Sequence, residues 1–84
     1  MRWFLYILEC GDSTLYTGIT NDLERRIAAH ESGTGAKYTK GRGPFKLLYS
    51  EEFEDRSGAS KYEVKIKALS RLDKLDLISQ NNPT

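Results

Sequence analysis

The N-terminal part of the chain shows two apolar segments that predict a β-hairpin. Trp3 to Leu8 is an unbroken run of apolar and aromatic residues, which is typical of a strand covered on both faces. Gly11 to Thr14 has turn chemistry, and Leu15 to Thr20 has the composition of a returning strand. The pattern therefore predicts two neighbouring strands joined by a short turn.

A helix is predicted directly after the hairpin. Asn21 is suited to cap its N-terminus, and Glu24, three residues later, completes a capping-box pattern. Gly33 interrupts the helical pattern, so the helix is expected to end near Ser32. Its apolar positions are expected to face the sheet.

A long loop and a third strand follow this helix. Gly33 to Pro44 is rich in glycine and lysine, and loops of this length in compact domains tend to be functional or disordered. Pro44 favours an extended conformation for Gly43 before it. Phe45 to Tyr49 is then expected to form the third strand.

Two helices are predicted for the C-terminal part. Asp55 or Ser57 can start the first, and Ser70 with Asp73 gives the cap signal of the second. Both carry apolar residues at helical spacing, namely Ala59, Tyr62, Ile66 and Leu69 in the first and Leu72, Leu75 and Ile78 in the second. The order of elements predicts a small α+β sandwich, formed as a single domain over residues 1–80 and followed by a polar tail at 81–84.

Composition limits the classes of protein to which this chain can belong. Its 84 residues are enough for one domain with a modest core. Cys10 is the only cysteine, which excludes an internal disulfide and a cysteine-based zinc site. The N-terminus does not resemble a secretion signal, and no apolar run is long enough to span a bilayer. We therefore expect a cytoplasmic protein that makes no contact with membranes.

The formal net charge of +1 hides an uneven distribution of charged residues. Acidic side chains gather between Glu51 and Asp55. Basic side chains gather between Glu24 and Lys46, where they are Arg25, Arg26, Lys37, Lys40, Arg42 and Lys46. A basic segment that also contains Tyr38 and glycines fits a polyanion site, although ordinary solvated surface charge explains it equally well.

Several short motifs resemble those of a known nuclease family. Phe4-Leu5-Tyr6 and Tyr16-Thr17-Gly18 resemble the two segments that give the GIY-YIG nuclease superfamily its name. Arg26 and His30 fall on the family's helix positions, and Glu63 falls on its glutamate. The resemblance covers nearly the whole chain and is closest to short stand-alone bacterial proteins of the YhbQ-like group.

This resemblance implies both a fold and an activity. The fold is a three-stranded antiparallel sheet flanked by helices in the order β-β-α-β-α-α, and the activity is metal-dependent endonucleolytic hydrolysis of phosphodiester bonds. The implied cofactor is one divalent cation, Mg²⁺ in the first place and Mn²⁺ as the alternative, with Glu63 as its ligand. Phe4 and Thr17 depart from the family pattern, which has glycine and isoleucine there. The implied catalytic residues are Tyr6, Tyr16, Arg26, His30 and Glu63.

These side chains are chemically suited to the reaction. Hydrolysis needs an activated water and stabilisation of the charge on the phosphoryl oxygens. Glu63 suits a magnesium ion that keeps water and phosphate ligands, and the guanidinium of Arg26 suits a phosphate oxygen. Tyr6 or Tyr16 would take the proton from the attacking water while the other orients it. Because the ordinary pKa of a phenol is about 10, a nearby cation would have to lower it. His30 can orient a water or a tyrosine near neutral pH.

Each of these residues also has an ordinary structural explanation. Tyrosines in neighbouring strands are commonly core aromatics. A glutamate or arginine on a helix is commonly a solvated charge, and a histidine near a helix C-terminus is favoured by the helix dipole. The nuclease hypothesis therefore has a geometric requirement: both tyrosine hydroxyls must lie on one face of the sheet, near Arg26 and Glu63.

The glycine- and lysine-rich loop is the candidate for contact with nucleic acid. Lys37, Lys40 and Arg42 can neutralise phosphates. Tyr38 can stack on an unpaired base. Nothing resembles a base-reading helix, so specificity would come from the shape of the nucleic acid or from a partner protein. DNA is expected ahead of RNA as the substrate.

Two other functions use the same features. A binding module of the same fold would keep the basic loop but have little or no cleavage activity. A non-catalytic interaction protein would use the acidic segment Glu51 to Asp55 or the final helix. The nuclease is favoured because binding alone does not require the combination of Tyr6, Tyr16, Arg26, His30 and Glu63.

Overall fold

A central strand, β1 (Trp3–Glu9), organises the fold. It pairs antiparallel with β2 (Leu15–Thr20) on one side and β3 (Lys46–Phe53) on the other, in the order β2-β1-β3. The computed structural model describes residues 2–80, and the predicted tail at 81–84 lies outside the described residues. Residues 5–8 of β1 are all buried, as predicted for a strand covered on both faces.

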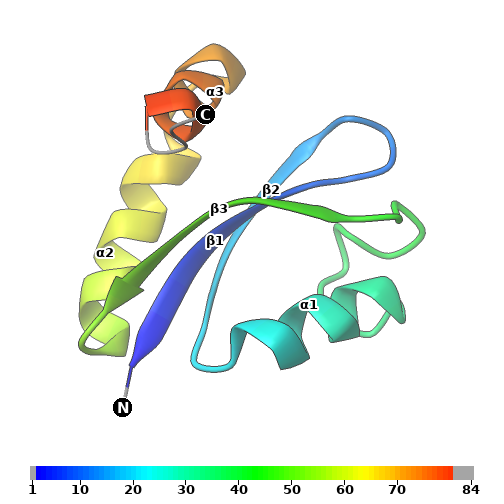
Figure 1. Ribbon diagram of the computed structural model, residues 1–84, viewed down its shortest axis with the longest axis horizontal. Coiled ribbons are helices and arrows are strands. Elements are labelled where there is room, and N and C mark those ends of the chain that lie inside the picture. Colours follow the sequence, from blue (N-terminus) through cyan, green and yellow to red (C-terminus); the bar gives the residue numbers. More distant parts are fainter. Residues whose placement is uncertain (1, 81–84) are drawn as a thin grey trace.

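Helices cover both faces of this sheet. Helix α1 (Leu23–Glu31) lies on one side, and α2 (Arg56–Lys67) and α3 (Arg71–Gln80) lie on the other (Figure 1). The order β1-β2-α1-β3-α2-α3 confirms the predicted α+β fold. Within residues 2–80, none of the helices has the length and apolarity that crossing a membrane requires.

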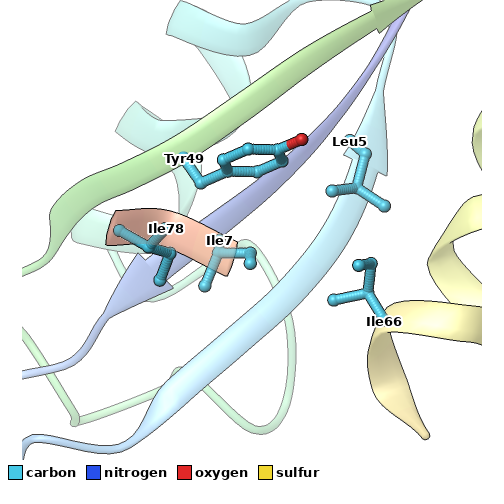
Figure 2. Packing of buried hydrophobic residues seen from close by; sticks show 5 residues of the cluster. All are labelled: Leu5, Ile7, Tyr49, Ile66 and Ile78. Carbon is cyan, nitrogen blue, oxygen red and sulfur yellow. The ribbon is translucent and has the colours of Figure 1, made fainter. Parts of the chain in front are cut away.

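The main hydrophobic core lies between the sheet and the pair α2 and α3. Leu5 and Ile7 of β1 meet Tyr49 of β3, Ile66 of α2 and Ile78 of α3 (Figure 2). The predicted apolar stripe of α2 contributes to this core, since Ala59 and Ile66 are buried and Tyr62 and Leu69 pack against the buried cluster. The odd-numbered residues of β1 thus serve the core, which leaves its even-numbered residues for the opposite face.

The start of α1 differs from the prediction by one residue. Asp22, not Asn21, is the N-cap, and its carboxylate accepts a hydrogen bond from the backbone N–H of Arg25 at 3.2 Å. Thr20 Oγ1 in turn accepts from the backbone N–H of Asp22 at 3.1 Å. These bonds place Asp22 in an extended conformation just before the helix, and its carboxylate then reaches the N–H three residues on.

Strand β3 is longer than the prediction of Phe45 to Tyr49. It begins at Lys46 and runs to Phe53, because residues 50–53 pair with the first half of β1. Glu51 and Glu52 belong to this extension, because strand pairing is decided by the neighbouring backbone and not by side-chain charge. Figure 1 shows β3 running the full length of the sheet beside β1.

The end of α1 and the starts of α2 and α3 agree with the sequence analysis, whereas α2 ends at Lys67, before Leu69, which the sequence had placed in this helix. Ser32 is the C-cap of α1. The carboxylate of Asp55 accepts from the N–H of Gly58 at 2.8 Å, and the hydroxyl of Ser70 accepts from the N–H of Asp73 at 3.1 Å. Short polar side chains therefore start α2 and α3, as their positions in the sequence predicted.

A pair of substitutions on α2 tests the assignment of the core. Ile66→Ala removes a side chain that is 2% exposed and should lower the free energy of unfolding by about 2–5 kcal/mol, because it leaves a cavity. Val64→Ala, at a side chain that is 67% exposed, should change it by less than about 0.5 kcal/mol. Urea unfolding of the two variants measures the difference. Equal effects would contradict this description of the core.

Candidate active site

Tyr6 and Tyr16 lie on the face of the sheet opposite the main core. Strand pairing places Tyr6 opposite Gly18 and Leu8 opposite Tyr16, so both phenol rings point towards α1. Their ring centroids are 6.3 Å apart. The geometric requirement that both hydroxyls share one face is met, although their catalytic role stays a prediction.

Gly18 makes room for the Tyr6 hydroxyl. A Cβ atom at position 18 would lie 2.5 Å from the Tyr6 hydroxyl oxygen and 2.7 Å from the ring carbon that carries it. Tyr6 is fully buried, so its ring has no free space into which to retreat. The glycine of the second motif therefore permits the position of the tyrosine of the first motif.

His30 joins this tyrosine pair from α1. Its side chain is 1% exposed, and its Nε2 lies 2.8 Å from the Tyr6 hydroxyl. Its Nδ1 lies 2.7 Å from Thr39 Oγ1, in the loop that follows α1. The imidazole also contacts the Tyr16 ring edge-on, with centroids 5.2 Å apart. One buried ring thus links the sheet, α1 and the loop.

We infer the tautomer of His30 from the hydrogen bonds of Thr39. The Thr39 hydroxyl has a single proton and donates it to the backbone carbonyl of Ala36 at 3.0 Å. Its oxygen therefore accepts the bond from His30, so Nδ1 carries the proton and Nε2 is the acceptor for the Tyr6 hydroxyl. Burial lowers the pKa of His30, and the positive charge of Arg26 lowers it further, which favours this neutral form.

Arg26 lies one helical turn before His30 and reaches the same tyrosines. Burial raises the pKa of Tyr6, whereas hydrogen bonding to Arg26 opposes this change without cancelling it. Tyr6 is therefore a neutral phenol at physiological pH. The Nε of Arg26 is buried and, within residues 2–80, has no hydrogen-bond partner. A buried donor of this kind is suited to an anionic ligand.

Glu63 approaches the tyrosines from α2. Its side chain is 19% exposed and forms an ion pair with Lys67 at 3.3 Å. The charge of Glu63 contributes, as one of the smaller causes, to the raised pKa of Tyr6, so the carboxylate acts on the tyrosine site. Among the residues that the structure describes, no three His, Cys, Asp or Glu side chains gather into a metal site. A single carboxylate nevertheless fits Mg²⁺, which commonly keeps water and phosphate oxygens as its other ligands.

The loop residues proposed to bind nucleic acid divide into two groups. Lys37 and Lys40 are exposed to solvent. Tyr38 stacks on Tyr16, with ring centroids 5.9 Å apart and planes 23° apart. Arg42 lies over the Tyr38 ring at 4.4 Å and forms an ion pair with Asp12 in the β1–β2 turn. Arg42 therefore holds the loop in place, and it is less free to meet a phosphate than the two lysines.

Sequence reasoning missed Thr39 and Gly35. Thr39 is 1% exposed and bonds to His30, yet a threonine in a polar loop carries no signal of burial. A Cβ atom at Gly35 would lie 2.5 Å from His30 Nδ1, so this glycine lets the loop approach the imidazole closely. The only available hint was the unusual length of the loop itself.

Comparison with known proteins matches the chain to one family along nearly its whole length. Residues 2–76 match the model of the GIY-YIG catalytic domain. A UPF0213 protein of Clostridium perfringens is 56% identical over 79 residues, covering 94% of this chain and 85% of that protein. A UPF0213 protein of Oceanobacillus iheyensis is 55% identical over 75 residues, covering 89% of this chain and 87% of that protein.

Solved structures agree with this match. The solution NMR structure of a UPF0213 protein from Bacillus halodurans is similar with a TM-score of 0.64 and 48% identity, covering 96% of this chain and 86% of that one. A solution NMR structure of a protein from E. faecalis gives a TM-score of 0.65 and 36% identity, covering 100% of this chain and 91% of that one. The resemblance to a short, stand-alone bacterial group is thereby confirmed.

The lowered pKa of His30 predicts a specific dependence of stability on pH. As the pH falls below the ordinary histidine pKa of about 6.5, the unfolded state takes up a proton before the folded state does. The free energy of unfolding should fall by up to about 1.4 kcal/mol per pH unit until the folded pKa is reached. Urea unfolding between pH 7 and pH 5 measures this. Because His30 is the only histidine, the slope should disappear in His30→Gln. The same slope in wild type and in His30→Gln would contradict the assignment of this pH dependence to His30.

Substitution of Thr39 tests the tautomer of His30. Thr39→Val removes the acceptor for Nδ1–H and should shift the ring towards the Nε2–H tautomer, whereas Thr39→Ser should keep the present one. The ¹⁵N chemical shifts of the imidazole report the protonated nitrogen directly. An unchanged tautomer in Thr39→Val would mean that Thr39 does not set it.

Proposed function

The chain belongs to the GIY-YIG family, and on that premise we propose that it is a metal-dependent endonuclease that hydrolyses phosphodiester bonds in DNA. The family match supports a nucleic-acid substrate, and the choice of DNA over RNA is part of the proposal. The proposed catalytic residues are Tyr6, Tyr16, Arg26, His30 and Glu63.

The observation that supports this proposal most is the buried hydrogen bond between Tyr6 and His30. The Tyr6 O–H points at an imidazole nitrogen that is free to accept its proton, and Thr39 holds the imidazole in that tautomer. A fold that only binds nucleic acid does not need a buried proton acceptor behind a tyrosine. In an enzyme that removes a proton from water, such an acceptor can take up that proton.

This geometry assigns a role to Tyr6 that its pKa allows. Since Tyr6 is a neutral phenol, it is not a ready-made phenolate base. Because Tyr6 is buried, the site must open for a water to reach its hydroxyl. Its oxygen can then accept the proton of that water while its own proton moves to His30 Nε2. The proton thereby crosses from water to the imidazole in two short steps. Of the two tyrosines, Tyr6 is the one proposed as the base because His30 bonds to it directly. Tyr16, which contacts both rings, would orient the water.

Arg26 and Glu63 are proposed to meet the phosphate. The guanidinium of Arg26, which lines a surface pocket, would donate to a phosphate oxygen and stabilise the negative charge that develops there. Glu63 would hold a divalent cation, Mg²⁺ or Mn²⁺, which would supply further charge stabilisation. For Glu63 to do so, its ion pair with Lys67 must open. The exposed lysines Lys37 and Lys40 would neutralise phosphates further along the strand.

The acidic segment offers little support for a protein-interaction function. Glu51 accepts a hydrogen bond from Tyr49, Glu52 pairs with Arg2 at 2.8 Å, and Asp55 caps α2. These carboxylates have structural roles within the fold. The binding module of the same fold remains the alternative to the nuclease, and cleavage assays distinguish the two.

A cleavage assay with titrated Mg²⁺ tests the proposal. Labelled single-stranded, duplex and branched DNA and RNA are incubated with wild type, Glu63→Gln and Tyr6→Phe. Glu63→Gln should abolish metal-dependent cutting, and Tyr6→Phe should lower kcat at least about 100-fold, because loss of a general base removes 10²–10⁴-fold. The wild-type rate should also fall as the pH drops through the lowered pKa of His30, since a protonated imidazole accepts no proton.

The matched control is Glu54→Gln, which removes an exposed carboxylate outside the proposed site and should leave the rate unchanged. Binding of DNA by all variants is measured in parallel. Wild-type protein that binds every nucleic acid without cutting any, with either metal, would overturn the proposed nuclease in favour of the binding module.

A further inference from the structure

A cavity beside the tyrosine site has no role in the chemistry described above. It has a volume of about 270 Å³ and lies where the edge strand β2 meets the loop and the two C-terminal helices. We propose that this cavity binds one unpaired nucleotide of the strand being cut, next to the scissile phosphate. The proposal rests on the proposed nuclease function and adds its substrate class. The cavity is lined by Leu15, Tyr16, Thr17, Tyr38, Lys67 and Lys74.

One wall of the cavity is aromatic and apolar. Tyr16 and Tyr38 stack on each other there, and Leu15 lies beside them. Tyr38 is 43% exposed, but Tyr16 stacks on its ring and Arg42 lies over it, so a base that stacks on Tyr38 would have to displace the Arg42 guanidinium. Aromatic walls of this kind bind nucleobases without regard to sequence, because every base has a π-face. This wall is therefore suited to a base that has left its stack.

Thr17 lines the same cavity, and its buried hydroxyl would reach a ligand there after rotation of the side chain. Its side chain is 3% exposed, and its Oγ1 is buried without a hydrogen-bond partner within the described part of the chain. A buried hydroxyl without a partner costs free energy, so its presence calls for an explanation. The polar edge of a base would satisfy this hydroxyl. This would also explain why the chain has Thr17 where the family pattern has isoleucine, because isoleucine cannot form a hydrogen bond to a base.

Two lysines make the opposite rim of the cavity positive. Lys67 comes from the end of α2 and Lys74 from α3, and their charges complement the phosphates on either side of a bound nucleotide. Lys67 also pairs with Glu63, the proposed metal ligand. Tyr16 belongs both to the cavity and to the tyrosine site. A nucleotide in the cavity would therefore lie directly beside the phosphate to be cut.

This arrangement determines the class of nucleic acid. The base edge must reach between side chains to meet Thr17, and a base that stays stacked and paired in a duplex cannot do so. The substrate is accordingly a single strand, or a loop, flap or junction with an unpaired nucleotide at the cut.

Binding measured without cleavage tests this inference separately from the proposed function. Labelled oligonucleotides, single-stranded and duplex, are titrated in EDTA and followed by fluorescence anisotropy. Wild type should bind the single strand more tightly. Thr17→Val should weaken single-strand binding about 2- to 10-fold and Tyr38→Ala about 5- to 100-fold. Lys74→Ala should reduce the salt slope of log K by about 0.7.

The controls separate a binding role from a structural one. Thr17→Val keeps the shape of the side chain and removes the buried hydroxyl, so its midpoint of thermal unfolding should be equal to or higher than that of wild type. Lys65 is an exposed lysine of α2 outside the cavity. Lys65→Ala removes the same charge as Lys74→Ala at a different place, so it should weaken single-strand binding less. Unchanged single-strand binding in both Thr17→Val and Lys74→Ala, or equal affinity of wild type for duplex, would overturn the inference. Cleavage that persists in that case would leave the nuclease proposal intact.

Discussion

The hydrogen bond between Tyr6 and His30 is the contact on which the candidate site depends. It joins the central strand to α1, and the second nitrogen of the same imidazole joins α1 to the loop through Thr39. Because both partners are buried, the bond forms only if strand, helix and loop are all in place. The same bond also explains the position of Arg26, because a residue one turn before His30 on α1 lies on the same helix face and near the same tyrosine. The site is thus a product of tertiary structure, not of any one motif.

The sequence predicted the fold better than it predicted the individual contacts, and the catalytic roles of the site residues stay predictions. Continuous and periodic apolar patterns identified the strands and helices, because burial of these positions drives the folding. The predicted N-cap was wrong because Asn21 and Asp22 are both capping residues, and the bond from the N–H of Asp22 to Thr20 decides between them. The predicted end of β3 was wrong because pairing with the distant strand β1 decides it. The involvement of Thr39 was invisible for a similar reason: its partner, His30, lies nine residues away on another element.

The structure separates the basic residues by their surroundings, whereas binding of a polyanion stays a proposal. The basic segment between α1 and β3 contains side chains with different tasks. Arg26 lies in the tyrosine site, Arg42 fastens the loop to Asp12 and Tyr38, and Lys37 and Lys40 remain in solvent. A net charge close to zero is therefore compatible with a local excess of positive charge on the face where a polyanion would bind.

The alternation of β1 has a consequence for how this protein can change over evolutionary time. Leu5 and Ile7 build the core on one face of the strand, while Tyr6 lies between them in sequence and reaches the opposite face. Insertion or deletion of a single residue in β1 would exchange the two faces and lose stability and chemistry together. Changes of chain length are therefore better tolerated outside β1, for example in exposed parts of the loop after α1. The length of β1 is thus constrained by the core and by the tyrosine site at the same time.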